Sequence, residues 1–198
     1  MFLNPPPAQA ASPWVQRWSH LVAPGATVLD VACGLGRHVR WFTDRGHHVT
    51  GVDRAPAHVQ ALADLAATGR AELVQADIEN AAWPLMEAGR PRLFGAVVVT
   101  NYLWRPLMPL LRESLAPGGV LLYETFAHGN AAVGKPARPD FLLQGGELLD
   151  FCRELRIVAY EDGFRQDPPR YIQRIAAVQA SRAPSPADTT VARYLLPS

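Results

Sequence analysis

The chain has 198 residues, the size of one domain with a substantial core. Hydrophobic residues make up 48% and charged residues 19%, and 19 basic against 18 acidic side chains give a formal net charge of +1. This balance is typical of a globular protein and argues against an extended nucleic-acid footprint. Two cysteines are too few for a disulfide framework, and no apolar run reaches the roughly 18 to 20 residues that span a bilayer. The N-terminus lacks the pattern of a signal peptide, so we expect a cytoplasmic protein with no membrane partner.

Predicted strands and helices alternate along the chain. After a Pro- and Ala-rich start, a helix is predicted over residues 14–22, with Ser12 as N-cap and Pro13 in its first turn. Hydrophobic spacing then predicts strands over 27–31, 48–52, 71–75, 96–100, 120–123, 156–161 and 171–179, and helices over 37–45, 56–67, 106–115 and 146–153. This alternation predicts a mainly parallel sheet with helices on both faces. The last two strands, joined by a polar loop without a helix, are expected to pair antiparallel at one edge.

The first strand runs into a turn of small residues that opens a helix. Small residues allow close approach of the backbone to a ligand, and a helix N-terminus adds free N–H groups, although a tight turn without a ligand has the same pattern. A nicotinamide-dinucleotide fingerprint that starts at Gly34 requires a third glycine where Val39 stands. No Gly-Lys-Ser or Gly-Lys-Thr of a P-loop follows either. The turn therefore fits neither of these phosphate-binding motifs.

Acidic residues end three successive strands: Asp30, Asp53 and Asp77. In a doubly wound sheet Asp53 lies beside the first turn, where its carboxylate can accept hydrogen bonds from ribose hydroxyls. Taken singly, Asp53 is also compatible with a helix cap and Asp77 with a turn. Together their negative charge suits a cationic, sugar-bearing ligand better than a pyrophosphate, and a sulfonium nucleoside meets that description.

Five segments in order resemble the motifs of class I S-adenosylmethionine (SAM)-dependent methyltransferases: 28–36, 51–53, 76–78, 94–103 and 115–121. The resemblance covers residues from about 18 to about 178, and the Gly-Arg-His that continues the first motif is similar to small bacterial members likened to tellurite-resistance methyltransferases. Ala32 replaces the commoner glycine of the first motif. The fourth motif lacks the Asn-Pro-Pro-Tyr or Asp-Pro-Pro-Tyr of enzymes that methylate amide or base nitrogens, which disfavours those substrates.

The resemblance implies an α/β fold, a doubly wound Rossmann-like seven-stranded sheet in the order 3-2-1-4-5-7-6 with strand 7 antiparallel. It implies a single methyltransferase domain over residues 1–180, with an N-terminal segment and capping helix in 1–22, and a tail over 181–198. Gly34 and Gly36 would approach the methionine part of SAM, Asp53 the ribose, and Asp77 and Ile78 the adenine. The full set of expected cofactor-binding residues is Asp30, Ala32, Cys33, Gly34, Gly36, Arg37, Asp53, Arg54, Ala76, Asp77, Ile78, Thr100, Asn101 and Tyr102.

The expected reaction is in-line methyl transfer to a small-molecule acceptor, with no metal and with S-adenosylhomocysteine (SAH) as product. Tyr102 and His128 are the candidates for a catalytic proton acceptor, since Tyr102 lies in the fourth motif and His has a suitable pKa. Further candidates expected on loops at the strand ends are Arg105, Tyr123 and Glu124.

Lys135 and Arg138 stand on a long loop, 127–140, which is either a lid that orients an anionic substrate or a solvated loop. An RNA or protein methyltransferase of this fold, and a SAM-binding module without turnover, remain the alternatives. A monomer and a homodimer are equally compatible with the sequence.

Overall fold

The computed structural model describes residues 10–181 and 192–197. The predictions for residues 1–9 and for most of the tail therefore lie outside the described residues. Among the described residues, no helix is both long and apolar enough to cross a membrane.

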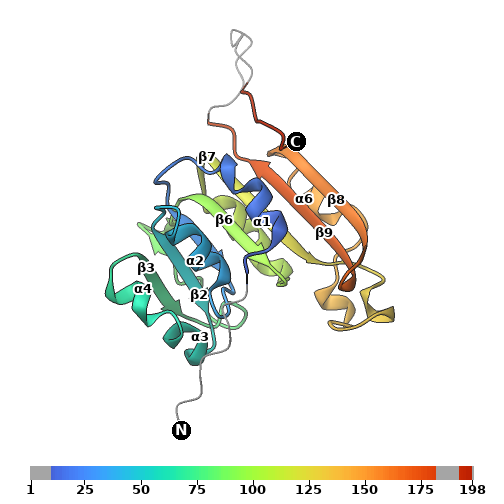
Figure 1. Cartoon of the computed structure of the whole chain (residues 1–198), viewed down its shortest axis with the longest axis horizontal. Helices are drawn as coiled ribbons and strands as arrows, with labels where there is room; N and C mark the ends of the chain where they lie inside the picture. Colours follow the sequence, from blue (N-terminus) through green and yellow to red (C-terminus); the bar gives the residue numbers. More distant parts are fainter. Residues whose placement is uncertain (1–9, 182–191, 198) are drawn as a thin grey trace.

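A seven-stranded sheet forms the centre of the molecule (Figure 1). In spatial order its strands are β3 (Ala71–Gln75), β2 (Val49–Asp53), β1 (Val28–Val31), β6 (Phe94–Thr100), β7 (Leu115–Phe126), β9 (Pro169–Val178) and β8 (Arg156–Gln166). The pairs from β3 to β7 are parallel, and β9 runs antiparallel to both of its neighbours. Numbered along the chain within this sheet, the order is 3-2-1-4-5-7-6 with strand 7 antiparallel, so the predicted fold is confirmed.

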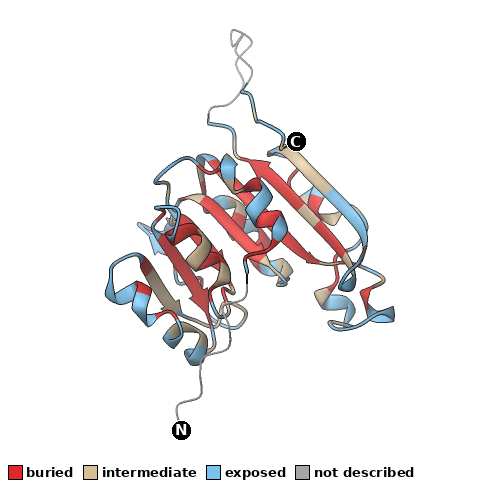
Figure 2. Cartoon of the chain, viewed as in Figure 1, coloured by how far each residue is buried: buried red, intermediate tan, exposed pale blue. Residues whose placement is uncertain are grey.

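Helices cover both faces of the sheet, and the central strands are buried (Figure 2). One apolar cluster joins the sheet to residues of α1 (Pro13–Trp18), α2 (Arg37–Thr43) and α4 (Ala63–Ala67), and the other joins it to α5 (Met108–Glu113) and α6 (Glu147–Phe151). The remaining short helices are α3 (Pro56–Gln60), η1 (Ser19–Leu21), η2 (Arg105–Leu107), η3 (Asn130–Ala132) and η4 (Pro139–Phe141). Because β3, β2, β1, β6 and β7 are parallel, they all end at one common edge of the sheet.

Several element boundaries differ from the prediction. The helix expected over 56–67 is split into α3 and α4, because Leu62 leaves helical angles (φ −113°, ψ 9°) and is fully buried. The helix expected over 14–22 ends at Trp18 and continues as η1. A small hairpin of β4 (Met86–Glu87) and β5 (Arg90–Pro91) was not predicted. The last two strands are longer than expected and leave only a tight connection between Gln166 and Pro169.

Gly119, in β7, stands where any side chain would meet main-chain atoms. A Cβ there would lie 2.8 Å from the Ala116 oxygen and 3.0 Å from the Phe94 oxygen. Gly119→Ala is therefore expected to lower the free energy of unfolding by about 1–3 kcal/mol in urea titration. Gly163→Ala is the control, since open space surrounds Gly163 and its stability should change by less than about 0.5 kcal/mol. Equal stability of the two variants would contradict this account of Gly119.

Candidate active site

The turn between β1 and α2 uses left-handed backbone at three positions. Ala32, Gly34 and Gly36 have φ values of 52°, 56° and 75°, and Gly36 is the N-cap of α2. A Cβ on Gly36 would overlap the buried Leu62 side chain, whereas Gly34 has nothing within 4 Å of that position. Gly36 is thus required for packing, and the space beside Gly34 is left for a ligand. Ala32, the departure from the family pattern, adopts the glycine-like conformation at the cost of strain on the order of 1 kcal/mol.

Asp53, at the end of β2, is bound to this turn. Its Oδ2 accepts a hydrogen bond from the Gly34 N–H (2.8 Å), and its Oδ1 accepts one from the Ala55 N–H (2.9 Å) and contacts His58 Nδ1 (3.0 Å). Burial acts to raise the pKa of Asp53, but the donors from Ala55, Gly34 and His58 outweigh it and hold the pKa below its usual value. Asp53 is therefore a fixed carboxylate. His58 was missed in the sequence, where only its place in the first turn of the helix after Asp53 could have indicated it.

Asp30, in β1, is a buried carboxylate without a partner. Its side chain is 1% exposed, and neither oxygen has a hydrogen-bond partner among the described residues. Burial raises its pKa to about 7, although the Arg37 guanidinium opposes the shift. An unpartnered buried carboxylate beside a glycine turn is suited to a ligand that carries positive charge or hydrogen-bond donors.

A cavity of about 330 Å³, here called the Asp53 cavity, opens at the ends of β1, β2 and β3. It brings together seven of the predicted cofactor-binding residues with Ala55, His58 and Glu79; the seven are Ala32, Asp53, Arg54, Ala76, Asp77, Ile78 and Tyr102. The Asp77 carboxylate also accepts hydrogen bonds from the N–H groups of Glu79 (3.0 Å) and Asn80 (3.2 Å), so it fixes the turn that walls the cavity.

A second cavity, also of about 330 Å³ and here called the Phe126 cavity, adjoins the first through shared residues. Arg54, Glu79 and Tyr102 line both, and the remaining walls of the second are Asn101, Leu103, Thr125, Phe126, Pro136 and Phe141. These walls come from the segment after β6, from the end of β7 and from the loop that follows β7. Asn101, a wall of the second cavity and the neighbour of Tyr102 in the chain, holds a left-handed φ of 55°, which asparagine adopts more readily than most residues.

The loop 127–140 contributes only Pro136 to this cavity. Lys135 and Arg138, the two cations expected to orient a substrate, do not line it, and Arg138 is exposed and pairs with Asp140 (2.8 Å). The contacts of Arg138 are those of a solvated loop rather than those of a lid over the cavity.

The two catalytic candidates are placed very differently. Tyr102 lies at the boundary of both cavities, but burial and the nearby Glu79 carboxylate raise its pKa above the usual value, which makes its hydroxyl a poor proton acceptor at neutral pH. His128 is exposed and lines neither cavity. Among the residues that line the two cavities, the histidine is His58, which is bound to Asp53, and the glutamate is Glu79, which lies on the wall that the cavities share.

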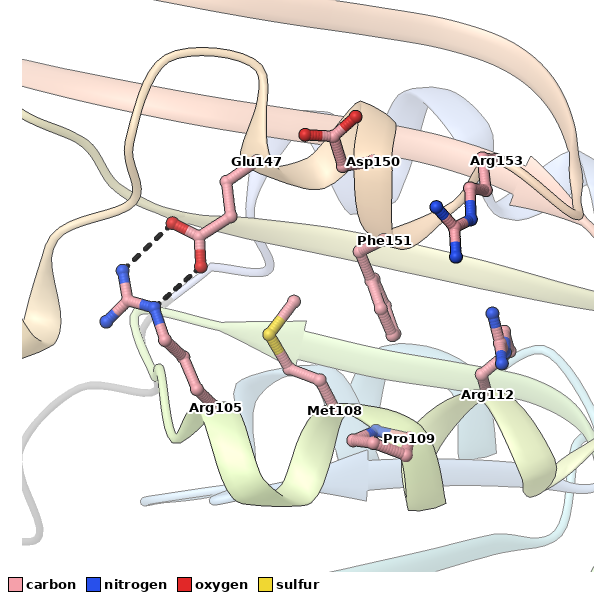
Figure 3. A pocket seen from close by; sticks show the side chains of 8 residues that line it. All are labelled: Arg105, Met108, Pro109, Arg112, Glu147, Asp150, Phe151 and Arg153. Atoms are coloured by element: carbon pink, nitrogen blue, oxygen red, sulfur yellow. Dashed lines mark hydrogen bonds and ion pairs between the residues drawn. The ribbon is translucent and has the colours of Figure 1, made fainter.

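The other loop candidates have structural contacts. Tyr123 is fully buried in β7, and its hydroxyl donates to the main-chain carbonyl oxygen of Tyr102 (3.1 Å). Arg105 forms a fork with Glu147 (2.6 and 2.9 Å) at a surface groove between α5 and α6 and lines neither cavity (Figure 3). Cys33, in the first turn, is buried, and burial followed by the charges of Asp30 and Asp53 raises the pKa of its thiol. It packs in the core, as expected for a small residue there.

Glu124 was expected on a loop but is buried inside β7, where it anchors the N-terminal helix. Ser12, the N-cap of α1, donates from its Oγ to Glu124 (2.8 Å) and from its N–H to His38 Nε2 (3.1 Å). Burial, with the charge of Arg37, lowers the pKa of His38 to about 3, so the ring is neutral and its Nδ1–H faces Thr100 Oγ1 (3.5 Å). The start of α1 is thus fixed over the strand ends.

Comparisons with known proteins agree with this geometry. Residues 28–119 match the family model of a methyltransferase domain. The malonyl-[acyl-carrier protein] O-methyltransferase of Serratia marcescens is 34% identical over 113 residues, which cover 54% of this chain and 41% of that protein. This chain thus spans less than half of that relative.

Solved structures share the fold. TehB of Haemophilus influenzae superposes with a TM-score of 0.64 at 18% identity, over 81% of this chain and 59% of that one. The glycopeptide N-methyltransferase MtfA in complex with SAH superposes with a TM-score of 0.57 at 21% identity, over 84% and 88% of the two chains.

The match over residues 28–119 identifies a methyltransferase domain in this chain, and the solved structures share its fold. The cofactor of SAM-dependent methyltransferases of this fold is SAM, and one of the solved structures holds its product SAH. The residues present fit that group, because the turn leaves space beside Gly34, Asp53 faces a cavity, and the buried Asp30 oxygens lack partners. Among the described residues no cluster of His, Cys, Asp or Glu is placed to hold a metal ion.

The raised pKa of Asp30 predicts a pH-dependent cost in the protein without SAM. The unfolded chain loses this proton above about pH 4, whereas the folded protein keeps it until about pH 7, so the free energy of unfolding falls between these values. Asp30→Asn should therefore be more stable than the wild type by a few kcal/mol at pH 8 and equally stable at pH 4, measured by urea unfolding.

The control for this test is Asp64→Asn. The Arg40 side chain lowers the pKa of Asp64, so this variant should lose stability above about pH 4 rather than gain it. If the difference in unfolding free energy between the wild type and Asp30→Asn did not change with pH, the pKa of Asp30 would not be raised in the folded protein.

Proposed function

We propose that this chain transfers the methyl group of SAM to a small-molecule acceptor, with the nucleoside in the Asp53 cavity and the acceptor in the Phe126 cavity. The observation that carries the proposal is the junction of these two cavities at Tyr102, on the edge where the parallel strands end. A bounded cavity of about 330 Å³ suits a small molecule better than a polymer.

The residues around the turn are proposed to position SAM. Asp53 would accept hydrogen bonds from the ribose hydroxyls, Asp77 and Ile78 would border the adenine, and the backbone at Gly34 would approach the methionine part. Asp30 and Arg37 would lie beside the charged end of the same ligand. When bound, SAM supplies a methyl carbon whose bond to sulfur breaks, with the electron pair staying on sulfur, as a lone pair of the acceptor forms the new bond in line.

The chain's own contribution is then orientation and exclusion of water. Tyr102 is a poor proton acceptor, His128 lies outside both cavities, and Glu79 is the carboxylate that lines the Phe126 cavity. An acceptor that is already deprotonated, such as a carboxylate or a thiolate, needs no proton acceptor from the chain. The name of the Serratia relative describes O-methylation of a malonyl group, which supports an acid of this kind. Methylation of RNA or protein is the second candidate, and a strongly salt-dependent RNA affinity would favour it.

Binding of SAM tests the cofactor half of the proposal. Isothermal titration calorimetry should detect SAM and SAH binding to the wild type, and Asp53→Ala should weaken it by about tenfold or more, because charge-assisted hydrogen bonds to the ribose are lost. Asp64→Asn, on the exposed side of α4, should bind as the wild type does. Circular dichroism must show that Asp53→Ala is folded, because Asp53 also fixes the Gly34 and Ala55 amides.

Turnover tests the acceptor half. Release of SAH should be found with carboxylates or thiols in a panel that also contains phenols, amines and tRNA. Binding of SAM without release of SAH from any of these classes would instead support the SAM-binding module, and failure of the wild type to bind millimolar SAM would overturn the proposal as a whole.

A further inference from the structure

The segment that follows the loop 127–140 supplies an aromatic wall of the Phe126 cavity. Phe141 ends η4 and lines this cavity, together with Phe126 from the end of β7. Two residues further on, the Leu143 N–H donates to the main-chain oxygen of Phe126 (3.0 Å), and the His128 N–H donates to that of Leu143 (2.8 Å). The segment that carries Phe141 is therefore attached to the main chain where β7 ends.

Arg105 provides a second attachment for this segment. It is the first residue of η2 and follows the part of the chain that lines the cavity after β6. Its Nη1 donates to the main-chain oxygen of Asp140 (2.9 Å), and its Nη2 donates to that of Leu142 (2.9 Å). These two carbonyl groups flank Phe141 in the chain. The guanidinium thus holds the backbone on both sides of a residue that lines the cavity.

Glu147, at the start of α6, fixes the guanidinium in this position (Figure 3). Its carboxylate accepts hydrogen bonds from Nε (2.6 Å) and Nη2 (2.9 Å) of Arg105, and its Oε2 also accepts one from the Gln144 N–H (2.8 Å). Burial acts to raise the pKa of Glu147, but the donors of Arg105 and Gln144 outweigh it and hold the pKa below its usual value. A planar guanidinium can bind a carboxylate and two carbonyls at once, whereas the single ammonium group of a lysine cannot reach all of them.

We propose that Arg105 is a positioning residue of the acceptor site, which holds Phe141 in place as a wall of the Phe126 cavity. This inference rests on the proposed function, because that function places the acceptor in this cavity. Arg105 itself lines the groove between α5 and α6, so it acts through the backbone of residues 140–142 and not by contact with the acceptor. Without the guanidinium, two carbonyls and a carboxylate lose their donors, and the wall at Phe141 loosens.

The walls of the cavity also indicate the kind of acceptor that would depend on Phe141. They include the apolar side chains of Leu103, Phe126, Pro136 and Phe141. An acceptor with an aromatic body next to its reacting atom would lie against these side chains. Thiophenol is the probe for this purpose, because its thiol is largely ionised near neutral pH and its ring matches the apolar walls.

Hydrogen exchange of the protein without ligand tests the attachment by itself. Arg105→Gln should speed the exchange of the amides in residues 139–144 by about tenfold or more, because the backbone there loses its side-chain donors. Arg105→Lys keeps the charge and should recover part of the protection. Arg112→Gln is the matched control, since Arg112 lines the same groove but pairs with Glu154 (3.2 Å), and exchange in 139–144 should change by less than about twofold.

Methylation of thiophenol tests the effect on the acceptor. Arg105→Gln should raise the KM for thiophenol about tenfold and change kcat by less than about threefold, because a contact made equally in the ground state and the transition state is lost. A smaller folded fraction would instead lower kcat and leave KM unchanged. Phe141→Ala should raise KM by itself, and Arg105→Gln added to it should have an effect below about twofold, since both changes act on one wall.

Three results would overturn the inference: unchanged exchange of residues 139–144 in Arg105→Gln, an unchanged KM in this variant, or full additivity of Arg105→Gln and Phe141→Ala. A wild type that binds SAM but releases no SAH from thiophenol would contradict the thiol acceptor of the proposed function. Faster exchange of 139–144 in Arg105→Gln would still support the attachment of Phe141 in that case, so the two failures are distinguishable.

Discussion

The hydrogen bond from the Gly34 N–H to the Asp53 carboxylate, 2.8 Å long, is the constraint on which the site depends. It ties the end of β2 to the turn that follows β1, and it holds the turn in a left-handed conformation that leaves one side open. The same carboxylate fixes the Ala55 amide just before α3. A single side chain thus joins the turn, the entry to the next helix and the cavity between them.

Much of the fold could be predicted because its signals are local. The short apolar runs are buried strands, and the family motifs gave the strand order. The boundaries failed where a contact distant in the sequence decides the conformation, as at Leu62, whose packing against Gly36 interrupts the helix expected over 56–67. The small hairpin at 86–91 carries no periodicity that could have revealed it.

The structure brings together more of the residues expected to bind the cofactor than of those expected around the acceptor, for a similar reason. Asp53 and Asp77 each follow a strand, and the common edge of a parallel sheet brings such residues together. The acceptor side depends on how far β7 extends and on what the strand register places opposite it. Glu124 was expected on a loop and is inside the strand, where its partners are set by the strand register and by the N-terminal helix.

The anchoring of α1 has a consequence for the order in which the chain can fold during synthesis. Ser12 is bound to Glu124, and the Trp14 indole donates to the Ile175 oxygen, 161 positions later in the chain. Helix α1 therefore lacks part of its docking surface until β9 has been synthesised. Contacts of such long sequence separation form late, so we expect the final strand to complete the fold and to bring the N-terminal helix over the edge of the sheet in the same step.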